Sequence, residues 1–137
     1  MTAAYLLDTD VVSESMKRKP NAGVVEWLTG VGDRGFLSVL TVGELRRGER
    51  LLARRDPAQA IVIAEWIAGI EHAYRGQIID LDIVAATRWG EISGAGRTLP
   101  IIDALIAATA MAHDLTLVTR NAADFAGVPV RTLNPFT

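Results

Sequence analysis

Short apolar runs alternate along the chain with longer stretches whose apolar residues recur every three or four positions. The short runs predict β-strands near residues 3–7, 36–39, 77–80, 115–119 and 130–133. The longer stretches predict helices near residues 10–17, 22–30, 41–54, 57–74, 82–95, 101–113 and 121–126. Strands that alternate with helices in this way are typical of a parallel sheet covered by helices. The pattern therefore predicts an α/β fold with a mostly parallel sheet of about five short strands.

Two of the predicted helices have a recognisable apolar side. In the helix at 41–54 this side holds Leu45, Leu51 and Leu52, and most of the arginines lie elsewhere. In the helix at 101–113 the spacing of three to four residues selects Ile102, Leu105, Ile106 and Thr109. The three tryptophans, Trp27, Trp66 and Trp89, also fall in helical segments. We expect the tryptophans to pack in the core or at a dimer interface rather than to stack on a ligand.

The composition excludes several kinds of site. A chain of 137 residues, half of them hydrophobic, fits a single domain, 1–137, with a real core. The absence of cysteine excludes disulfides, thiolate zinc sites and cysteine nucleophiles, and two histidines are too few for a histidine-based metal site. No run approaches the roughly 20 apolar residues that span a bilayer, and the first residues do not resemble a signal peptide. We therefore expect a cytoplasmic protein with no membrane partner.

Four carboxylates lie just beyond an apolar run or in the first turn of a predicted helix: Asp8, Glu44, Asp103 and Asp124. In a parallel sheet the strand-to-helix junctions share one edge, which is also where ligands bind. Two unit charges about 5 Å apart repel by roughly 3 kcal/mol at an effective dielectric of about 20. A divalent cation would relieve that repulsion, and hard oxygen ligands suit Mg²⁺ or Mn²⁺. The pattern thus indicates an acidic metal site.

Each of these acids also has a local structural explanation. Asp8 or Asp10 would serve as the N-cap of the next helix. Thr41 and Glu44 have the spacing of a capping box, in which Glu44 returns to the amide of Thr41. Asp103 would sit in the first turn of a helix, where the dipole favours negative charge, and Asp124 has a similar cap-like setting. Taken singly, none of the four requires a metal.

Arginine supplies most of the positive charge, although the net charge is −2. Of the 14 basic residues 12 are arginines, and five lie close together in Arg46, Arg47, Arg50, Arg54 and Arg55. The guanidinium fork suits bidentate contacts with phosphate or carboxylate groups. A solvated helix face is an equally good interpretation of this cluster.

Three segments carry a resemblance to a known family: LLDTDVVSE, TVGELRRG and, most specifically, PIIDALIAATAMAHDLTLVTRNAADF. They resemble the PIN-domain ribonucleases of the VapC toxin type, including its FitB-like branch, over essentially the whole chain. The resemblance implies a three-layer α/β/α fold in which Asp8, Glu44, Asp103 and Asp124 gather Mg²⁺ or Mn²⁺. It also places Thr119 and Arg120 in the lining of the same pocket. One departure is Asp10, which would line the same pocket and stands where many relatives have asparagine. The extra acid would either join the metal shell, or tighten the binding of a second cation, or be an exchange between two good N-caps, and we favour the exchange.

The same resemblance implies the function. It predicts a metal-dependent endoribonuclease that acts as the toxin of a type II toxin–antitoxin module. The partners would be the RNA substrate, a small VapB-like antitoxin whose C-terminal segment covers the acidic site, and a second copy of the chain in a homodimer. Arg120 and the arginines at 46, 47 and 50 (Arg46, Arg47, Arg50) would contact the RNA backbone or a partner protein.

Two other functions fit parts of the sequence. Asp8-Thr-Asp10-Val-Val matches the start of haloacid-dehalogenase-type phosphatases, and LTLVT ending at Thr119 resembles their second motif. Those enzymes need a lysine near the phosphoryl group, whereas the only lysines are Lys17 and Lys19. A non-catalytic α/β module that binds RNA or protein through its arginines is the other alternative.

Overall fold

Five short parallel strands form a single sheet at the centre of the computed structural model, which describes residues 3–96 and 98–137. The strands are β1 (Tyr5–Leu7), β2 (Gly35–Ser38), β3 (Ile78–Ile79), β4 (Thr116–Val118) and β5 (Thr132–Leu133). Their order is β3-β2-β1-β4-β5, and each neighbouring pair is parallel. The chain moves outward from β1 in one direction through β2 and β3, and in the other through β4 and β5. The boundary between β1 and β4 is therefore the topological switch point, where open α/β sheets bind ligands.

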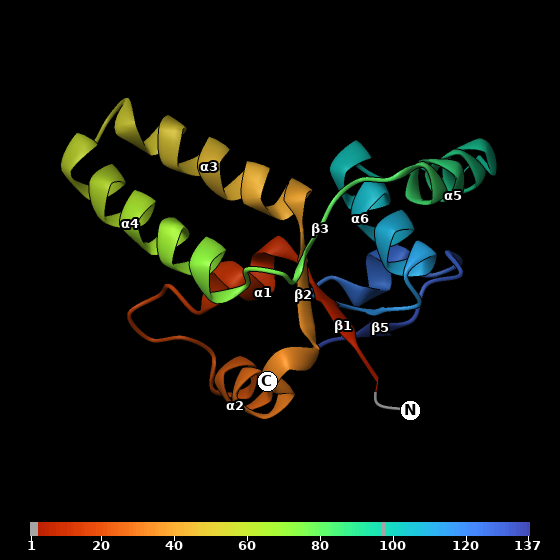
Figure 1. The fold of residues 1–137 in the computed structure, drawn as a ribbon, viewed down its shortest axis with the longest axis horizontal. Coiled ribbons are helices and arrows are strands. Elements are labelled where there is room, and N and C mark those ends of the chain that lie inside the picture. Colours follow the sequence, from red (N-terminus) through yellow and green to blue (C-terminus); the bar gives the residue numbers. More distant parts are fainter. Residues whose placement is uncertain (1–2, 97) are drawn as a thin grey trace.

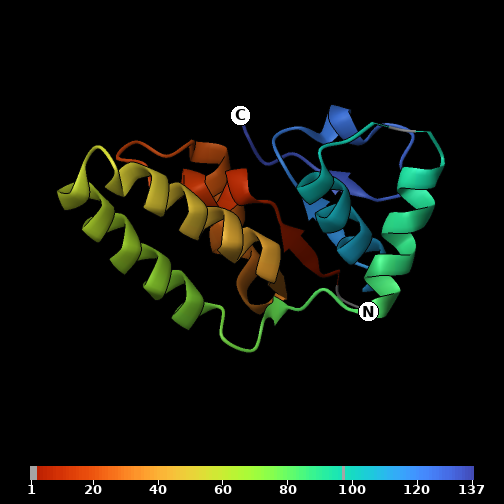
Figure 2. The same ribbon diagram turned by 90° about the horizontal axis from the view of Figure 1, so that it is seen from above.

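Helices cover both faces of this sheet (Figure 1). They are α1 (Thr9–Glu14), α2 (Ala22–Val31), α3 (Val39–Ala53), α4 (Pro57–Ala73), α5 (Ile83–Gly94) and α6 (Ile101–Ala112), with 3₁₀ turns η1 (Gly32–Arg34) and η2 (Ala122–Phe125). Figure 2 shows α3 and α4 side by side as one hairpin, and α5 and α6 as a second hairpin on the other side of the molecule. No helix in the described ranges is long and apolar enough to cross a membrane.

Successive side chains of β1 point to opposite faces of the sheet, and each packs in the core between the sheet and the helices on that face. Leu7 packs with Val24, Leu45 and Ile67, which come from α2, α3 and α4. Its neighbour Leu6 packs on the opposite face, with Ile106 of α6 and other residues. This alternation follows from the two-residue period of a strand. The predicted three-layer α/β/α fold is confirmed, and the sheet is parallel throughout the described strands.

The tryptophans belong to the core. The rings of Trp27 and Tyr5 meet edge to face with centroids 5.1 Å apart. Trp66 packs against the same cluster, and Trp89 against a smaller cluster between α5 and α6. The packing interpretation is thus confirmed for all three side chains.

Most sequence-predicted elements are present, with three differences. The segment at 121–126 is a 3₁₀ turn rather than an α-helix, and the first helix ends at Glu14. Helix α3 begins two residues earlier than predicted because Ser38 caps it, with Oγ accepting from the amide of Leu40 at 3.0 Å. The placement of Leu51 on the core side of this helix is wrong, since its side chain is 44% exposed. Figure 2 shows the reason: the α3–α4 hairpin extends past the sheet.

Candidate active site

Asp8 follows β1 directly and lies at the topological switch point. Leu7 pairs with Val118 in the sheet, so the next residues, Asp8 and Thr119, are neighbours on adjacent strands. The Thr119 hydroxyl donates to Asp8 Oδ2 at 2.8 Å, and the Thr9 amide donates to Oδ1 at 2.8 Å. Asp8 is 8% exposed, and this burial raises its pKa, although the two hydrogen bonds oppose the increase. Asp8 thus caps α1, as its local pattern predicts, and also holds a buried negative charge.

Glu44 reaches the same region from α3. Its carboxylate accepts a hydrogen bond from the Thr9 hydroxyl, which also lies 3.3 Å from the hydroxyl of Thr41. The capping-box interpretation of Thr41 and Glu44 is wrong, because the helix begins at Val39 and Thr41 is fully buried within its first turn. The Glu44 side chain does not cap its helix; it points toward α1, where its partner Thr9 is the residue after Asp8.

Asp103 lies in the first turn of α6, as predicted, with no side-chain cap at that helix end. Its pKa is raised, first by burial and then by the negative charges of Asp8, Glu44 and Asp124. Electrostatic influence of this kind decays with distance, so these three negative charges lie on the side of the molecule that Asp103 faces. Asp124 reaches this region from the exposed turn η2. The charges of three carboxylates that lie far apart in the sequence thus all act on Asp103.

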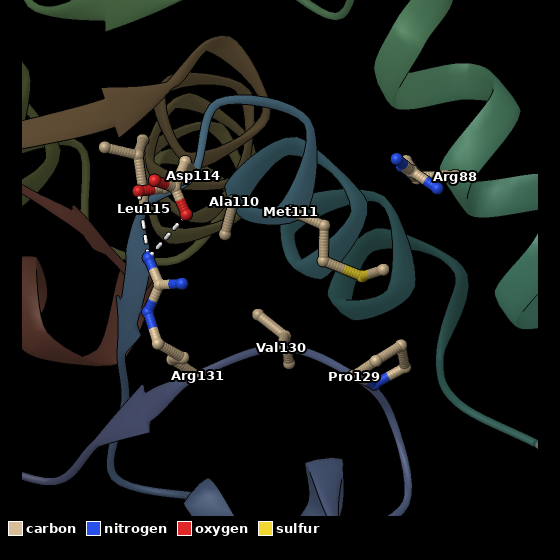
Figure 3. Close-up of a pocket in the computed structure, with 8 residues that line it drawn as sticks. All are labelled: Arg88, Ala110, Met111, Asp114, Leu115, Pro129, Val130 and Arg131. Carbon is tan, nitrogen blue, oxygen red and sulfur yellow. Dashed lines mark hydrogen bonds and ion pairs between the residues drawn. The ribbon is translucent and has the colours of Figure 1, made fainter.

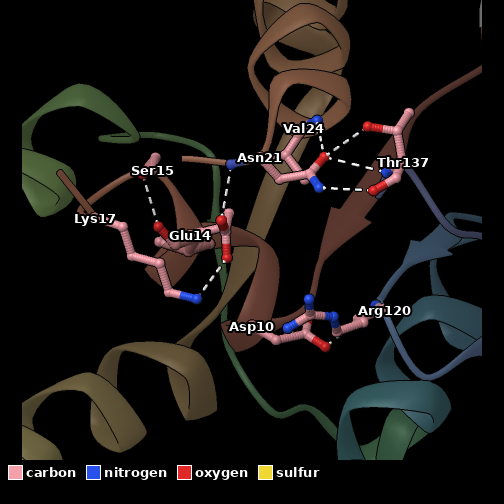
Figure 4. Close-up of polar contacts among 9 residues, drawn as sticks. Asp10, Glu14, Ser15, Lys17, Asn21, Val24, Arg120 and Thr137 are labelled. Atoms are coloured by element: carbon pink, nitrogen blue, oxygen red, sulfur yellow. Dashed lines mark hydrogen bonds and ion pairs between the residues drawn. The ribbon is translucent and has the colours of Figure 1, made fainter. Parts of the chain in front are cut away.

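Asp10 is bound to the loop that follows β4. Its Oδ2 accepts from the backbone amide of Arg120 at 3.1 Å, while Oδ1 is buried and has no hydrogen-bond partner (Figure 4). Burial, and after it the charge of Asp8, raises the pKa of Asp10 to about 6. The interpretation of Asp10 as an N-cap is wrong, because Asp8 occupies that position. Asp10 instead joins α1 to the loop carrying Thr119 and Arg120.

The donor set suits a hard divalent cation. All of its members are carboxylates; burial raises the pKa of Asp8, Asp10 and Asp103, and neighbouring negative charges raise it further at Asp10 and Asp103. A cation would supply the missing positive charge. As the side chains stand, no group of three or more His, Cys, Asp or Glu residues in the described ranges is closed around a metal position. The residue types and the charge imbalance therefore fit a metal, while the side chains would have to draw closer to hold it.

The raised pKa of Asp10 predicts how stability without metal depends on pH. The carboxyl group ionises near pH 3.8 when unfolded and near pH 6 when folded, so the folded protein binds the proton more tightly. The free energy of unfolding should therefore rise as the pH falls from about 7 through 6 toward 4.5. Below that range the lowered pKa of Glu14 acts in the opposite sense, because its ionised form is the stabilised one.

This pH dependence can be measured by thermal denaturation in EDTA. We expect Asp10→Asn to raise the melting temperature at pH 7.5 and to flatten its increase between pH 7 and 5. A variant that melted lower than wild type at pH 7.5, with an unchanged pH slope, would contradict this account of Asp10.

The arginines differ in their surroundings. Arg46 forms an ion pair with Glu71 of α4, so its charge is already matched within the chain. Arg50 borders a groove on the outer side of the α3–α4 hairpin. Arg47 lies nearer the acids, in a groove of 430 Å³ whose lining also contains Glu44. Of the three predicted contact residues, Arg47 is thus the one adjacent to the acidic region.

A separate cavity of 310 Å³ lies at the opposite end of α6 from Asp103 (Figure 3). Its lining includes Met111, Leu115 and Val130, and its charged groups are Arg88 and the ion pair between Arg131 and Asp114. None of the sequence-predicted site residues borders it. Its chemistry is therefore unrelated to that of the acidic site.

Sequence reasoning did not identify Thr9 or Phe136. Thr9 donates to Glu44, and Phe136 contacts the side chain of Arg120. Thr9 lies between two acids in Asp8-Thr9-Asp10, which is a usable signal for a polar site residue. Phe136 has no such local signal, because its partner lies 16 positions earlier in the sequence.

Comparison with known proteins identifies relatives over nearly the whole length. A family model described as PIN domain matches residues 5–130. The chain is 33% identical to toxin FitB of Neisseria gonorrhoeae over 136 residues, covering 96% of this chain and 97% of the relative. It is 28% identical to the VapC ribonuclease Y4jK of Sinorhizobium fredii over 137 residues, covering 96% of each.

Solved structures agree with these relatives. The crystal structure of FitAcB from Neisseria gonorrhoeae superposes with a TM-score of 0.86 and 34% identity, over 96% of this chain and 97% of that one. The structure of FitAB bound to an IR36 DNA fragment gives a TM-score of 0.87 and 32% identity, with coverage of 97% and 96%. The sequence resemblance to VapC-type PIN proteins is thereby confirmed.

Proposed function

This chain belongs to the PIN-domain family, and we propose that it is an RNA-cleaving toxin whose activity depends on Mg²⁺ or Mn²⁺. The observation that carries the proposal is the placement of Asp8, which is buried at the topological switch point of the sheet and held there by Thr119 and the Thr9 amide, with Glu44 bonded to the same Thr9. Relatives named as a toxin and as a ribonuclease support the same function.

Asp8 and Asp103 would be the principal ligands of the cation, with Glu44 and Asp124 completing its shell directly or through water. When bound, such a cation polarises the phosphoryl group and lowers the pKa of a coordinated water. The protein's own part is to orient the acids: Thr119 and the Thr9 amide fix Asp8, and the Thr9 hydroxyl fixes Glu44. Asp8 is buried and Asp103 is half-buried, and electrostatic interactions with buried carboxylates are stronger than those in bulk water.

The phosphatase alternative has no support in the structure. Its chemistry needs a lysine at the phosphoryl group, and Lys17 is instead paired with Glu14 at 2.9 Å, just beyond the end of α1. The match of residues 5–130 to the PIN domain also assigns the Asp8-Thr-Asp10 segment to a different family.

We place the RNA in the groove between α3 and α6. It has a volume of 430 Å³ and an apolar floor that includes Leu40 and Ile102, with Glu44 in its lining and Arg47 beside it. An apolar floor suits an unstacked base, and the guanidinium group suits a phosphate, which are the two parts of a single-stranded nucleotide. Gly43 leaves this groove open, because a Cβ atom at that position would meet nothing within 4 Å.

Substitution of Gly43 should distinguish an effect on RNA binding from an effect on the stability of the fold. Gly43→Leu should fill the groove and raise the KM for a single-stranded RNA by about tenfold or more, as a steric change in a binding pocket does. The same change should stabilise α3 by roughly 0.5–1 kcal/mol, because glycine is unfavourable inside a helix. Activity and stability would then move in opposite directions.

Gly69→Leu is the matched control, since Gly69 lies inside α4 and a Cβ atom at that position would also meet nothing within 4 Å. It should give a similar gain in stability and leave KM unchanged. Steady-state cleavage and thermal melting of the three proteins test the prediction. Equal KM values for Gly43→Leu and wild type would mean that the RNA does not bind in this groove.

We also propose two protein partners. A small antitoxin would bind over the acidic site, in keeping with the relatives whose structures are of FitAB complexes. A homodimer is supported by apolar side chains that the single chain leaves uncovered on α4, where Ile61 is 62% exposed and Val62 is 56% exposed. Exposed apolar surface of this kind is typical of association sites.

A further inference from the structure

Arg120 is held from two directions, at its backbone by Asp10 and at its side chain by Phe136. Its backbone amide donates to Asp10, and its guanidinium carbon lies 4.4 Å from the centroid of the Phe136 ring. The side chain of Arg120 is exposed, so packing alone does not fix it. Its positive charge also contributes to the lowered pKa of Glu14, after Lys17 and the Asn21 amide. The aromatic contact therefore selects one orientation for an otherwise free cation.

The backbone around Phe136 is bonded to the same loop. The Thr119 amide donates to the Leu133 carbonyl at 2.9 Å. The Asn134 side chain donates to the Arg120 carbonyl at 3.3 Å and accepts from the Phe136 amide at 3.0 Å. Residues 133–137, which we call the strap, thus run alongside Thr119 and Arg120 and present the ring to the guanidinium group.

Asn21 anchors the far end of the strap (Figure 4). Its Oδ1 accepts from the Thr137 amide at 3.1 Å, and its Nδ2 donates to the Thr137 carbonyl at 3.0 Å. Gly23 allows the close approach, because a Cβ there would lie 2.5 Å from the Pro135 carbonyl oxygen. The backbone amide of Asn21 in turn donates to the carboxylate of Glu14 at 2.8 Å, which links the anchor to α1.

We infer that Phe136 is a positioning residue that fixes the orientation of the Arg120 guanidinium, on the loop whose backbone is bonded to Asp10, so that it binds a phosphate of the RNA that enters the acidic site. The inference rests on the proposed ribonuclease function. Arg120 is suited to the task because a guanidinium group pairs with phosphate in a bidentate way, and a preset orientation reduces the entropy lost on binding.

The test compares Phe136→Leu, which removes the ring face, with Phe136→Tyr, which keeps it. In NMR spectra the side-chain protons of Arg120 should be shifted upfield by the ring in wild type and Phe136→Tyr, and not in Phe136→Leu. In cleavage of single-stranded RNA, Phe136→Leu should raise KM by about two- to fivefold, the range for one cation–π contact at an exposed site, with kcat nearly unchanged. Phe136→Tyr should keep the wild-type KM.

Two further variants separate positioning from general damage. In an Arg120→Ala background, Phe136→Leu should cause no additional rise in KM, because the cation it holds is gone. Gly23→Ala, which displaces the strap without touching Phe136, should reproduce both the lost upfield shift and the rise in KM. The inference would be overturned if the KM of the double variant rose by the product of the two single-variant factors. It would also be overturned if Phe136→Leu left KM unchanged. A wild type that shows the upfield shift but cleaves no RNA would overturn the proposed function, and with it the role of Arg120 at phosphate.

Discussion

Asp8→Asn should reduce cleavage of single-stranded RNA by more than about 100-fold, the size of loss seen when one charge-stabilising group is removed from an active site. Asparagine preserves the shape of the side chain and can still accept from the Thr9 amide, so the cap of α1 is retained. What it removes is the buried negative charge that we propose as a principal ligand of the cation. The expected outcome is a folded and inactive protein.

The same variant predicts a cellular result. Expression of the wild-type chain without an antitoxin should arrest bacterial growth, and Asp8→Asn should relieve the arrest. Growth rate, the amount of soluble protein and its melting temperature should be measured in parallel. Continued arrest by a correctly folded Asp8→Asn protein would mean that the toxicity does not arise from RNA cleavage at this site.

Asp103→Asn should have opposite effects on stability with and without metal. In EDTA the wild-type carboxylate is disfavoured by burial and by the charges of Asp8, Glu44 and Asp124. Removal of its charge should therefore raise the melting temperature of the metal-free protein. In Mn²⁺ the order should reverse, because the wild type gains binding energy that the variant lacks.

A thermal melt of both proteins in each condition checks this reversal. Asp33→Asn is the control, since Asp33 is an exposed acid in η1, before β2, at the opposite edge of the sheet from the acidic site. It should respond to Mn²⁺ as the wild type does. If Asp103→Asn were less stable than wild type in EDTA as well, Asp103 would be a structural residue and its raised pKa would not report a metal site.

The elements that position the acids were predictable because their patterns are local. The alternation of apolar strands and amphipathic helices specifies a parallel sheet, and a parallel sheet places its strand-to-helix junctions along one edge. Asp8 follows from that rule, since it lies directly between β1 and α1, whereas Asp103 lies in the first turn of α6, which follows α5 rather than a strand. The fold class and the family resemblance needed nothing beyond the sequence.

The errors arise where a local pattern competes with long-range packing. Thr41 and Glu44 have the right spacing for a capping box, but burial of Thr41 and capping by Ser38 move the helix start upstream. Asp10 has the composition of an N-cap, yet it bonds to Arg120, which is 110 positions away. The contact between Phe136 and Arg120 depends on where β5 lies beside β4, which no short window of sequence specifies.

The convergence of distant carboxylates on one cation is tested most directly by a calorimetric titration with Mn²⁺. The account predicts a saturable binding isotherm for the wild type, weaker binding by at least about tenfold for Asp103→Asn and Glu44→Gln, and wild-type affinity for Asp33→Asn. Equal Mn²⁺ affinities for wild type, Asp103→Asn and Glu44→Gln would contradict it.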